Sequence, residues 1–181
     1  MTTIIGLQND HGCVIAADSQ TTTSDGMPWQ HADLSKIVNR GSYLIAASGV
    51  NQSCDIALNI WQPPPRPPKQ SWYQFAITEL VPSLRACHAS NWFEPTPDDE
   101  WSLMIASRGE LLTIESDYSV LRSKSGMYGL GSGSPYALGA LAVLLASSVG
   151  ETSVKRAIEI ASAFDIYTAS QVSIITQPKG G

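Results

Sequence analysis

The sequence has 181 residues, of which 43% are hydrophobic and 15% are charged, and its formal net charge is −5. This length suits one domain over residues 1–181, and the apolar fraction is large enough for a packed core, which argues against global disorder. The net negative charge provides no basic field to attract nucleic acid or anionic lipid. We therefore expect no nucleic-acid partner and no membrane partner.

The cysteines and the apolar runs indicate the cellular compartment in which the chain is expected. Cys13, Cys54 and Cys87 are odd in number and far apart, with no CxxC spacing and no obvious disulfide framework, which fits a reducing, cytoplasmic setting. The longest apolar stretch, 136–146, is shorter than the roughly 18 residues of a membrane span. The N-terminus lacks a basic segment followed by an apolar run, so we expect no secretory signal.

Short apolar runs separated by polar turns predict two β-hairpins in the N-terminal part of the chain, with a loop over 19–30 between them. The expected hairpin elements are a strand from Thr3, a turn at 9–12, a strand at 13–17 closed by Asp18, a strand at 36–38, a turn at 39–41, and a strand at 43–47 ended by Ser48 and Gly49.

The rest of the chain predicts paired helices alternating with further strands, which together suggest a layered α+β sandwich. The expected elements are a helix at 52–60, a helix at 72–89 kinked at Pro82, a polar loop at 94–100, strands at 102–106, 111–115 and 120–122, a glycine-rich turn at 129–133, a helix from Pro135 to about Ser148, a helix at 154–164 capped by Thr152, and a strand at 172–176 before a tail.

A proline run at 63–68 interrupts the chain between the first two helices. Such a run cannot be helical or lie inside a sheet, and it favours the polyproline II conformation. It is interpreted as a stiff surface connector over about 62–69, and a recognition segment or an assembly contact is the alternative. Four tryptophans around this region are expected in the core or at a subunit interface: Trp61, Trp72, Trp92 and Trp101.

The first residues of the chain indicate how it could act as a catalyst. A small residue at position 2 allows removal of Met1, which leaves Thr2 with a hydroxyl and a free α-amine. A threonine hydroxyl needs an adjacent base to act as a nucleophile. An α-amine titrates near pH 7.7 to 8.0, so a single residue can supply both nucleophile and base. The alternative is that Met-Thr is an ordinary start of the chain, with no catalytic role for Thr2.

Other catalytic patterns are weaker. The three histidines have neither a GxSxG nor an HExxH context, and no P-loop lysine follows Gly131 to Gly133. We therefore expect no metal ion and no cofactor. The acidic run 98–100 is interpreted as a solvated loop.

The order of motifs from Thr2 onward resembles the proteasome β-subunit family, and most closely its bacterial HslV-like branch. The family's catalytic threonine, strand-ending aspartate, lysine and glycine match Thr2, Asp18, Lys36 and Gly49. The interval between Asp18 and Lys36 is slightly longer than in HslV, which places an insertion around 24–29. The resemblance covers nearly the whole chain and is weakest over 61–100.

The C-terminal half adds a GSGS turn at 131–134 that leads into a helix, and an aspartate followed by a hydroxyl residue after the next helix. By this resemblance Ser132, Asp165 and Thr168 support the N-terminal amine. Taken singly, each could simply cap a helix.

The resemblance implies a four-layer αββα sandwich and a threonine-type endopeptidase that cleaves peptides or unfolded proteins inside homo-oligomeric rings. An ATP-dependent unfoldase is a possible partner. It also implies that Thr2 attacks, that Lys36 favours deprotonation of the hydroxyl, that Asp18 holds Lys36, and that the Gly49 N–H stabilises the oxyanion. Two alternatives stay open: a non-catalytic ring assembly protein, and a stand-alone N-terminal-nucleophile amidase.

Overall fold

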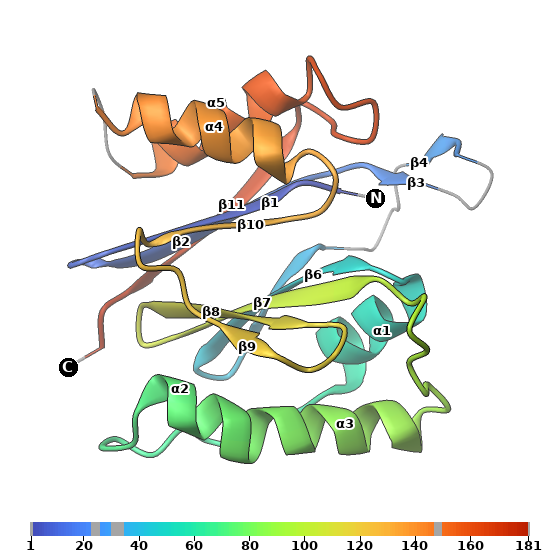
Figure 1. Cartoon of the computed structure of the whole chain (residues 1–181). Coiled ribbons are helices and arrows are strands. Elements are labelled where there is room, and N and C mark those ends of the chain that lie inside the picture. The colour runs from blue at the N-terminus through green and yellow to red at the C-terminus, as the bar shows by residue number, and fades with distance from the viewer. Residues whose placement is uncertain (1, 23–25, 30–34, 147–149, 181) are drawn as a thin grey trace.

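The computed structural model describes residues 2–22, 26–29, 35–146 and 150–180. Within these ranges four layers are stacked, helix on sheet on sheet on helix (Figure 1). The expected αββα sandwich is confirmed. The strands are β1 (Ile4–Asn9), β2 (Gly12–Asp18), β3 (Thr21–Thr22), β4 (Pro28–Trp29), β5 (Ile37–Arg40), β6 (Tyr43–Gly49), β7 (Trp101–Ser107), β8 (Glu110–Glu115), β9 (Val120–Leu121), β10 (Met127–Leu130) and β11 (Val172–Pro178).

The first sheet has the order β10-β1-β2-β11, with antiparallel pairing throughout. Every residue of β2 is buried, because one face of the sheet packs on helices and the other on the second sheet. Alternate residues serve the two faces: Ile4 and Ile15 contact the second sheet, whereas Ile5 and Val14 contact the helices. Burial on both faces explains why the 13–17 run is continuously apolar.

The second sheet has the order β5-β6-β7-β8-β9, and it contains both strands of the second predicted hairpin. The region 19–30, predicted as a loop, contains the short pair β3 and β4 instead. The insertion expected around 24–29 lies partly outside the described residues.

The helices cover the two outer faces of the sandwich (Figure 1). They are α1 (Asn51–Asp55), which continues as the π-helical turn η1 (Ile56–Ile60); α2 (Trp72–Phe75), which continues through the π-helical turn η2 (Ala76–Leu80) into α3 (Val81–Ser90); α4 (Ser134–Leu144); and α5 (Glu151–Ala161). The kink was expected at Pro82, but the irregular turn of this helix, η2, lies before Pro82 and ends at Leu80. In this turn the N–H of Val81 bonds to the Ala76 carbonyl. Pro82 lies in the first turn of α3 and has no N–H to donate to Thr78.

Two predictions about the C-terminal half were wrong. Gly129 lies in β10, paired with Ile5, and only the residues after Leu130 form the turn. A Cβ at Gly129 would lie 2.9 Å from Leu138 Cδ1, so the absence of a side chain lets α4 pack closely on this strand. Thr152 lies inside α5 and not at its cap, because the helix begins at Glu151 and Gly150 occupies the N-cap position. The helix expected to run to about Ser148 ends at Leu144, and Ser148 itself lies outside the described residues.

The proline run forms an extended strap held by the second sheet. The Tyr43 hydroxyl donates to the Pro64 carbonyl at 2.6 Å, and Arg108 donates to the Arg66 carbonyl at 2.9 Å. Arg66 forms an ion pair with Glu110 at 2.6 Å. These contacts fit the stiff connector interpretation. None of the described helices has the length and hydropathy needed to cross a lipid bilayer.

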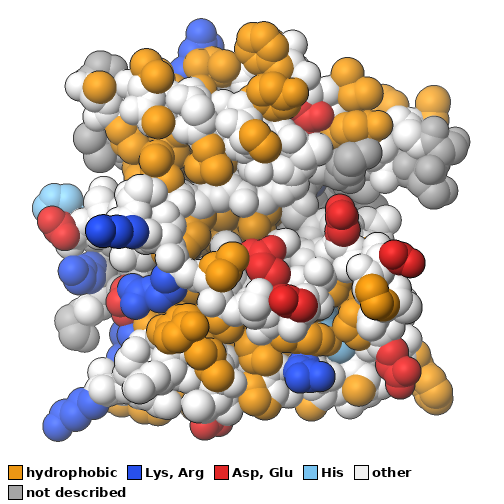
Figure 2. Space-filling model, in the orientation of Figure 1, with side chains coloured by type: hydrophobic (Ala, Val, Ile, Leu, Met, Phe, Trp, Pro, Cys, Tyr) orange, Lys and Arg blue, Asp and Glu red, His pale blue; other side chains and the backbone are white. Residues whose placement is uncertain are grey.

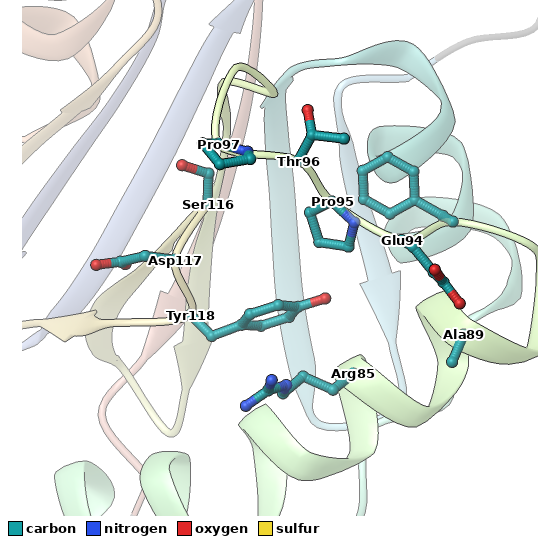
Figure 3. Close-up of a pocket in the computed structure, with 10 residues that line it drawn as sticks. Arg85, Ala89, Glu94, Pro95, Thr96, Pro97, Ser116, Asp117 and Tyr118 are labelled. Atoms are coloured by element: carbon teal, nitrogen blue, oxygen red, sulfur yellow. The ribbon is translucent and has the colours of Figure 1, made fainter.

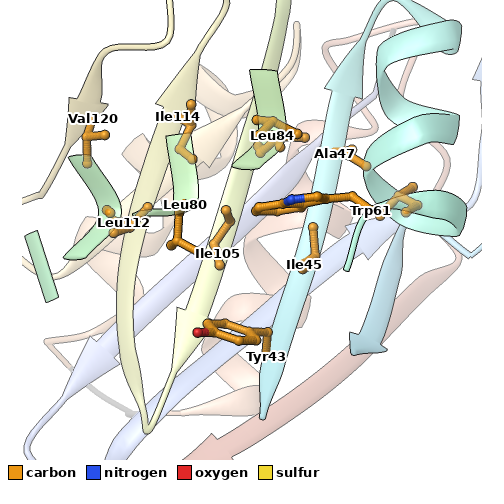
Figure 4. Packing of buried hydrophobic residues seen from close by; sticks show 14 of the residues in the cluster. Tyr43, Ile45, Ala47, Trp61, Leu80, Leu84, Ile105, Leu112, Ile114 and Val120 are labelled. Atoms are coloured by element: carbon orange, nitrogen blue, oxygen red, sulfur yellow. The ribbon is translucent and has the colours of Figure 1, made fainter. Parts of the chain in front are cut away.

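The largest hydrophobic cluster lies between the second sheet and helices α1 to α3, where Trp61, Leu84 and Ile105 meet (Figure 4). Trp61, Trp72 and Trp101 are buried in this cluster as expected, but Trp92 is 93% exposed.

Leu84→Ala is expected to lower the free energy of unfolding by about 2–5 kcal/mol, because Leu84 is fully buried and its truncation leaves a cavity. Urea unfolding measures this loss. Leu121→Ala is the matched control, since Leu121 is 53% exposed and should lose no more than about 0.5 kcal/mol. Equal losses for the two variants would contradict this account of the core.

Candidate active site

Asp18 stands at the end of β2 with its carboxylate buried, and its two oxygens accept five hydrogen bonds. Oδ1 accepts from Thr2 Oγ1 at 2.6 Å, from the Thr3 N–H at 2.8 Å and from Lys36 Nζ at 2.8 Å. Oδ2 accepts from the N–H groups of Gln20 at 2.9 Å and Ala169 at 3.1 Å. The carboxylate therefore connects the start of β1, the segment before β5 and the segment before β11.

Lys36 lies just before β5, and its ammonium group donates to Thr2 Oγ1, to Asp18 Oδ1 and to the Gln20 carbonyl. Its side chain is 9% exposed. Burial lowers the pKa of Lys36 below its usual 10.5, and the opposing attraction of Asp18 does not fully restore it. A cation in contact with Thr2 Oγ1 favours loss of the hydroxyl proton.

Gly49 ends β6 on the same side of the molecule. Its φ is +115°, and a Cβ at this position would lie 2.1 Å from the Glu100 carbonyl oxygen, so only glycine fits. Gly49 and Ser48 line two cavities, which therefore adjoin each other at the end of this strand.

A second carboxylate belongs to the same site. Asp165 Oδ2 accepts from Ser132 Oγ at 3.0 Å and from Thr168 Oγ1 at 2.5 Å. Thr168 Oγ1 in turn lies 2.6 Å from Thr3 Oγ1. The structure thus brings all seven sequence-predicted residues to the first residues of the chain: Thr2, Asp18, Lys36, Gly49, Ser132, Asp165 and Thr168.

The two cavities differ in size and in charge. The smaller, about 40 Å³, is lined by Thr2 and Lys36 and also by Cys54 and Leu58. The larger, about 610 Å³, extends from Gly49 past Ser132, and its charged lining residues are Asp98 and Glu100. Within the described part of the chain neither carboxylate has an ion-pair partner within 4 Å.

Several residues of the site were missed by sequence reasoning. Thr3, Gln20, Ala169 and Cys54 contact Asp18 or line the smaller cavity. Only Thr3 carried a signal: a hydroxyl residue inside an otherwise apolar strand start. Gln20 and Ala169 act through backbone N–H groups, which any residue type supplies.

A separate hollow of about 600 Å³ lies between α3, the 93–97 loop and the 116–118 turn (Figure 3). Arg85 stacks over the Tyr118 ring there at 4.9 Å. None of the sequence-predicted site residues lines it. Over the described residues, no group of three His, Cys, Asp or Glu side chains is arranged to hold a metal ion.

No protein-family model matches this sequence, and no curated protein is significantly similar to it. Solved structures share its fold. BPH of Thiobacillus denitrificans, in complex with epoxomicin, superposes with a TM-score of 0.80 at 21% identity, covering 99% of this chain and 100% of that one. HslV from Trypanosoma brucei gives 0.67 at 18% identity, covering 97% of this chain and 99% of that one.

Anbu, the ancestral beta-subunit from Yersinia bercovieri, gives a TM-score of 0.72 at 12% identity, covering 97% of this chain and 81% of that one. The fold of the chain is therefore that of proteasome-like N-terminal-nucleophile hydrolases, as the sequence resemblance implied.

The lowered pKa of Lys36 predicts a pH-dependent stability. In the unfolded chain the lysine keeps its proton up to about pH 10.5, whereas the folded protein releases it at lower pH. The unfolded state then binds more protons, so the free energy of unfolding should rise with alkaline pH through this window.

Urea unfolding at neutral pH and at pH about 9.5 tests this against Lys36→Gln, which lacks the titrating group. The wild type should gain stability relative to the variant as the pH rises. Lys155→Gln is the control, because the Lys155 side chain is 55% exposed. If the difference in free energy of unfolding between the wild type and Lys36→Gln stays constant or shrinks as the pH rises, the lowered pKa of Lys36 is contradicted.

Proposed function

We propose that the chain is a threonine-type endopeptidase subunit that cleaves peptide bonds with Thr2 once Met1 has been removed. The observation that carries the proposal is the contact of Thr2 Oγ1 with both the Lys36 ammonium and the Asp18 carboxylate. A buried threonine hydroxyl held between a cation and an anion fits the needs of a nucleophile that must lose a proton.

The reaction follows from these groups. Thr2 Oγ attacks the peptide carbonyl carbon, and the hydroxyl proton passes to the Thr2 α-amine, directly or through a water molecule. The oxyanion accepts a hydrogen bond from the Gly49 N–H. The C–N bond then breaks, the ammonium returns the proton to the leaving amine, and an ester remains on Thr2. Water hydrolyses the ester by the same proton path.

The carboxylates of Asp18 and Asp165 have different supporting roles in the proposed mechanism. Asp18 keeps Lys36 charged and directed at Thr2 Oγ1, which lowers the energy of the alkoxide character that develops during attack. Asp165 accepts hydrogen bonds from Ser132 and Thr168, and the contact of Thr168 with Thr3 links this group to the start of β1. We assign Ser132, Asp165 and Thr168 to support of the N-terminal amine.

Homo-oligomeric rings are part of the proposal. Apolar side chains gather over α4 and α5 on the surface (Figure 2), and Tyr136, Val143, Phe164 and Ile166 are each at least 49% exposed. A patch of this kind fits burial against another copy of the chain. We further propose unfolded proteins as substrates, a cytoplasmic location and an ATP-dependent unfoldase as a partner, all by the family resemblance.

The alternatives make different predictions. A stand-alone amidase needs no ring, so a particle of several subunits in sedimentation would count against it. A non-catalytic assembly protein has no use for a cation held against Thr2 Oγ1, and the contacts of Lys36 therefore argue against this role.

Intact-mass measurement before and after a peptide epoxyketone tests the proposal. The processed chain should lack Met1 and gain one inhibitor mass, because the reagent needs both the hydroxyl and the α-amine of Thr2. Thr2→Ala should gain nothing. A free Thr2 that never reacts, in a chain shown to be folded, would contradict the proposed activity.

The larger cavity predicts a charge preference. Asp98 and Glu100 should favour peptides that place Lys or Arg in this cavity over matched peptides with Gln. In the double variant D98N/E100Q, the ratio of kcat/KM for the basic peptide to kcat/KM for the Gln peptide should fall by about 3- to 10-fold at low salt. Asp117→Asn, which changes the separate hollow of Figure 3, is the control. An unchanged ratio would show that these carboxylates do not select substrate.

A further inference from the structure

Thr3 is a second hydroxyl residue at the start of the chain, and it is completely buried. Its N–H donates to Asp18 Oδ1 at 2.8 Å, and its Oγ1 lies 2.6 Å from Thr168 Oγ1. We propose that Thr3 is a positioning residue, which holds the Thr2 nucleophile in register between the Asp18 and Asp165 carboxylates. This inference rests on the proposed function of Thr2.

The direction of the Thr3 hydrogen bond follows from counting protons. Each hydroxyl has one proton to donate. Thr168 gives its proton to Asp165 Oδ2, at 2.5 Å, since the carboxylate can only accept. The bond between Thr3 and Thr168 must therefore use the Thr3 proton. A directed chain results, from Thr3 to Thr168 to Asp165, with Ser132 donating to the same carboxylate oxygen.

The two anchors of Thr3 leave Thr2 little freedom. The backbone of Thr3 is tied to the Asp18 side of the site and its side chain to the Asp165 side, so the strand start cannot shift toward one without stretching the other. Thr2, the preceding residue, must present its hydroxyl to Lys36 from this fixed base. Displacements of about 1 Å in such an arrangement can cost about 100-fold in rate.

Gly133 provides an independent observation of the same network. A Cβ at Gly133 would lie 2.1 Å from Thr3 Oγ1, 2.4 Å from Thr168 Oγ1 and 2.8 Å from Asp165 Oδ2. The backbone at Gly133 has φ −84° and ψ −5°, a conformation with negative φ that most residue types adopt in type I turns. The space against the three oxygens is thus the feature that requires glycine here.

The test compares Thr3→Val, which removes the hydroxyl and keeps the shape, with Thr3→Ser, which keeps the hydroxyl. For Thr3→Val we expect kcat and the rate of epoxyketone labelling to fall by about 10- to 100-fold, with KM changed by less than about 3-fold. Thr3→Ser should recover most of the loss. Gly133→Ala should resemble Thr3→Val. Gly139→Ala is the matched control because, apart from its chain neighbours and its own helix backbone, no atom lies within 4 Å of the added Cβ.

The outcomes separate this inference from the proposed function. If the wild type reacts and Thr3→Val reacts equally fast, the positioning role is overturned while the nucleophile stands. If Thr3→Ser is as impaired as Thr3→Val, the loss comes from packing and the inference also fails.

If the wild type itself never reacts, the proposed function fails, and hydrogen exchange of the N-terminal peptide then decides the inference. Faster exchange of the Thr3 amide in Thr3→Val, but not in Thr3→Ser, supports the double anchor. Unchanged exchange overturns it. A thermal melt identifies any variant that fails to fold, and Gly133→Ala then provides the comparison.

Discussion

The buried carboxylate of Asp18 is the constraint on which the rest of the site depends. An ionised group removed from water is stable only when it is paired and its lone pairs are satisfied. Asp18 meets this requirement with one ammonium, one hydroxyl and three backbone N–H groups, which come from four separate stretches of chain. Satisfying the carboxylate therefore brings Thr2 and Lys36 into contact, so the arrangement on which the proposed function rests follows from a requirement of folding.

The sandwich makes that convergence possible. β2 is buried on both faces, so Asp18 leaves the sheet at a point covered by helices on one side and by the second sheet on the other. The strand pairs β1–β2 and β2–β11 bring the start of the chain and the segment before β11 alongside it. The packed core is rigid, so groups at the strand ends are held at fixed separations.

The fold is shared with solved structures at 12–21% identity. Layered packing tolerates many apolar side chains of similar volume, so the fold persists while the sequence diverges. The chemical proposal depends on fewer positions and on stricter conditions. It rests on the contacts of Thr2 and on glycines where neighbouring atoms leave no room for a side chain, as at Gly49 and Gly133.

The sequence by itself determined the hairpins, the helices and the layered class, because apolar periodicity and turn residues are local signals. It also predicted Thr2, Asp18 and Lys36 as site residues, because their order along the chain resembles that of the proteasome β-subunit family. It missed β10, because the glycine in Met127–Leu130 reads as a turn until β1 pairs with it, and it placed the cap of α5 at the wrong residue. Only the tertiary structure decided which groups meet at Asp18 and Thr3. Backbone N–H groups such as those of Gln20 and Ala169 leave no trace in residue type, and contacts between residues 3 and 168 form only when the sheets are assembled.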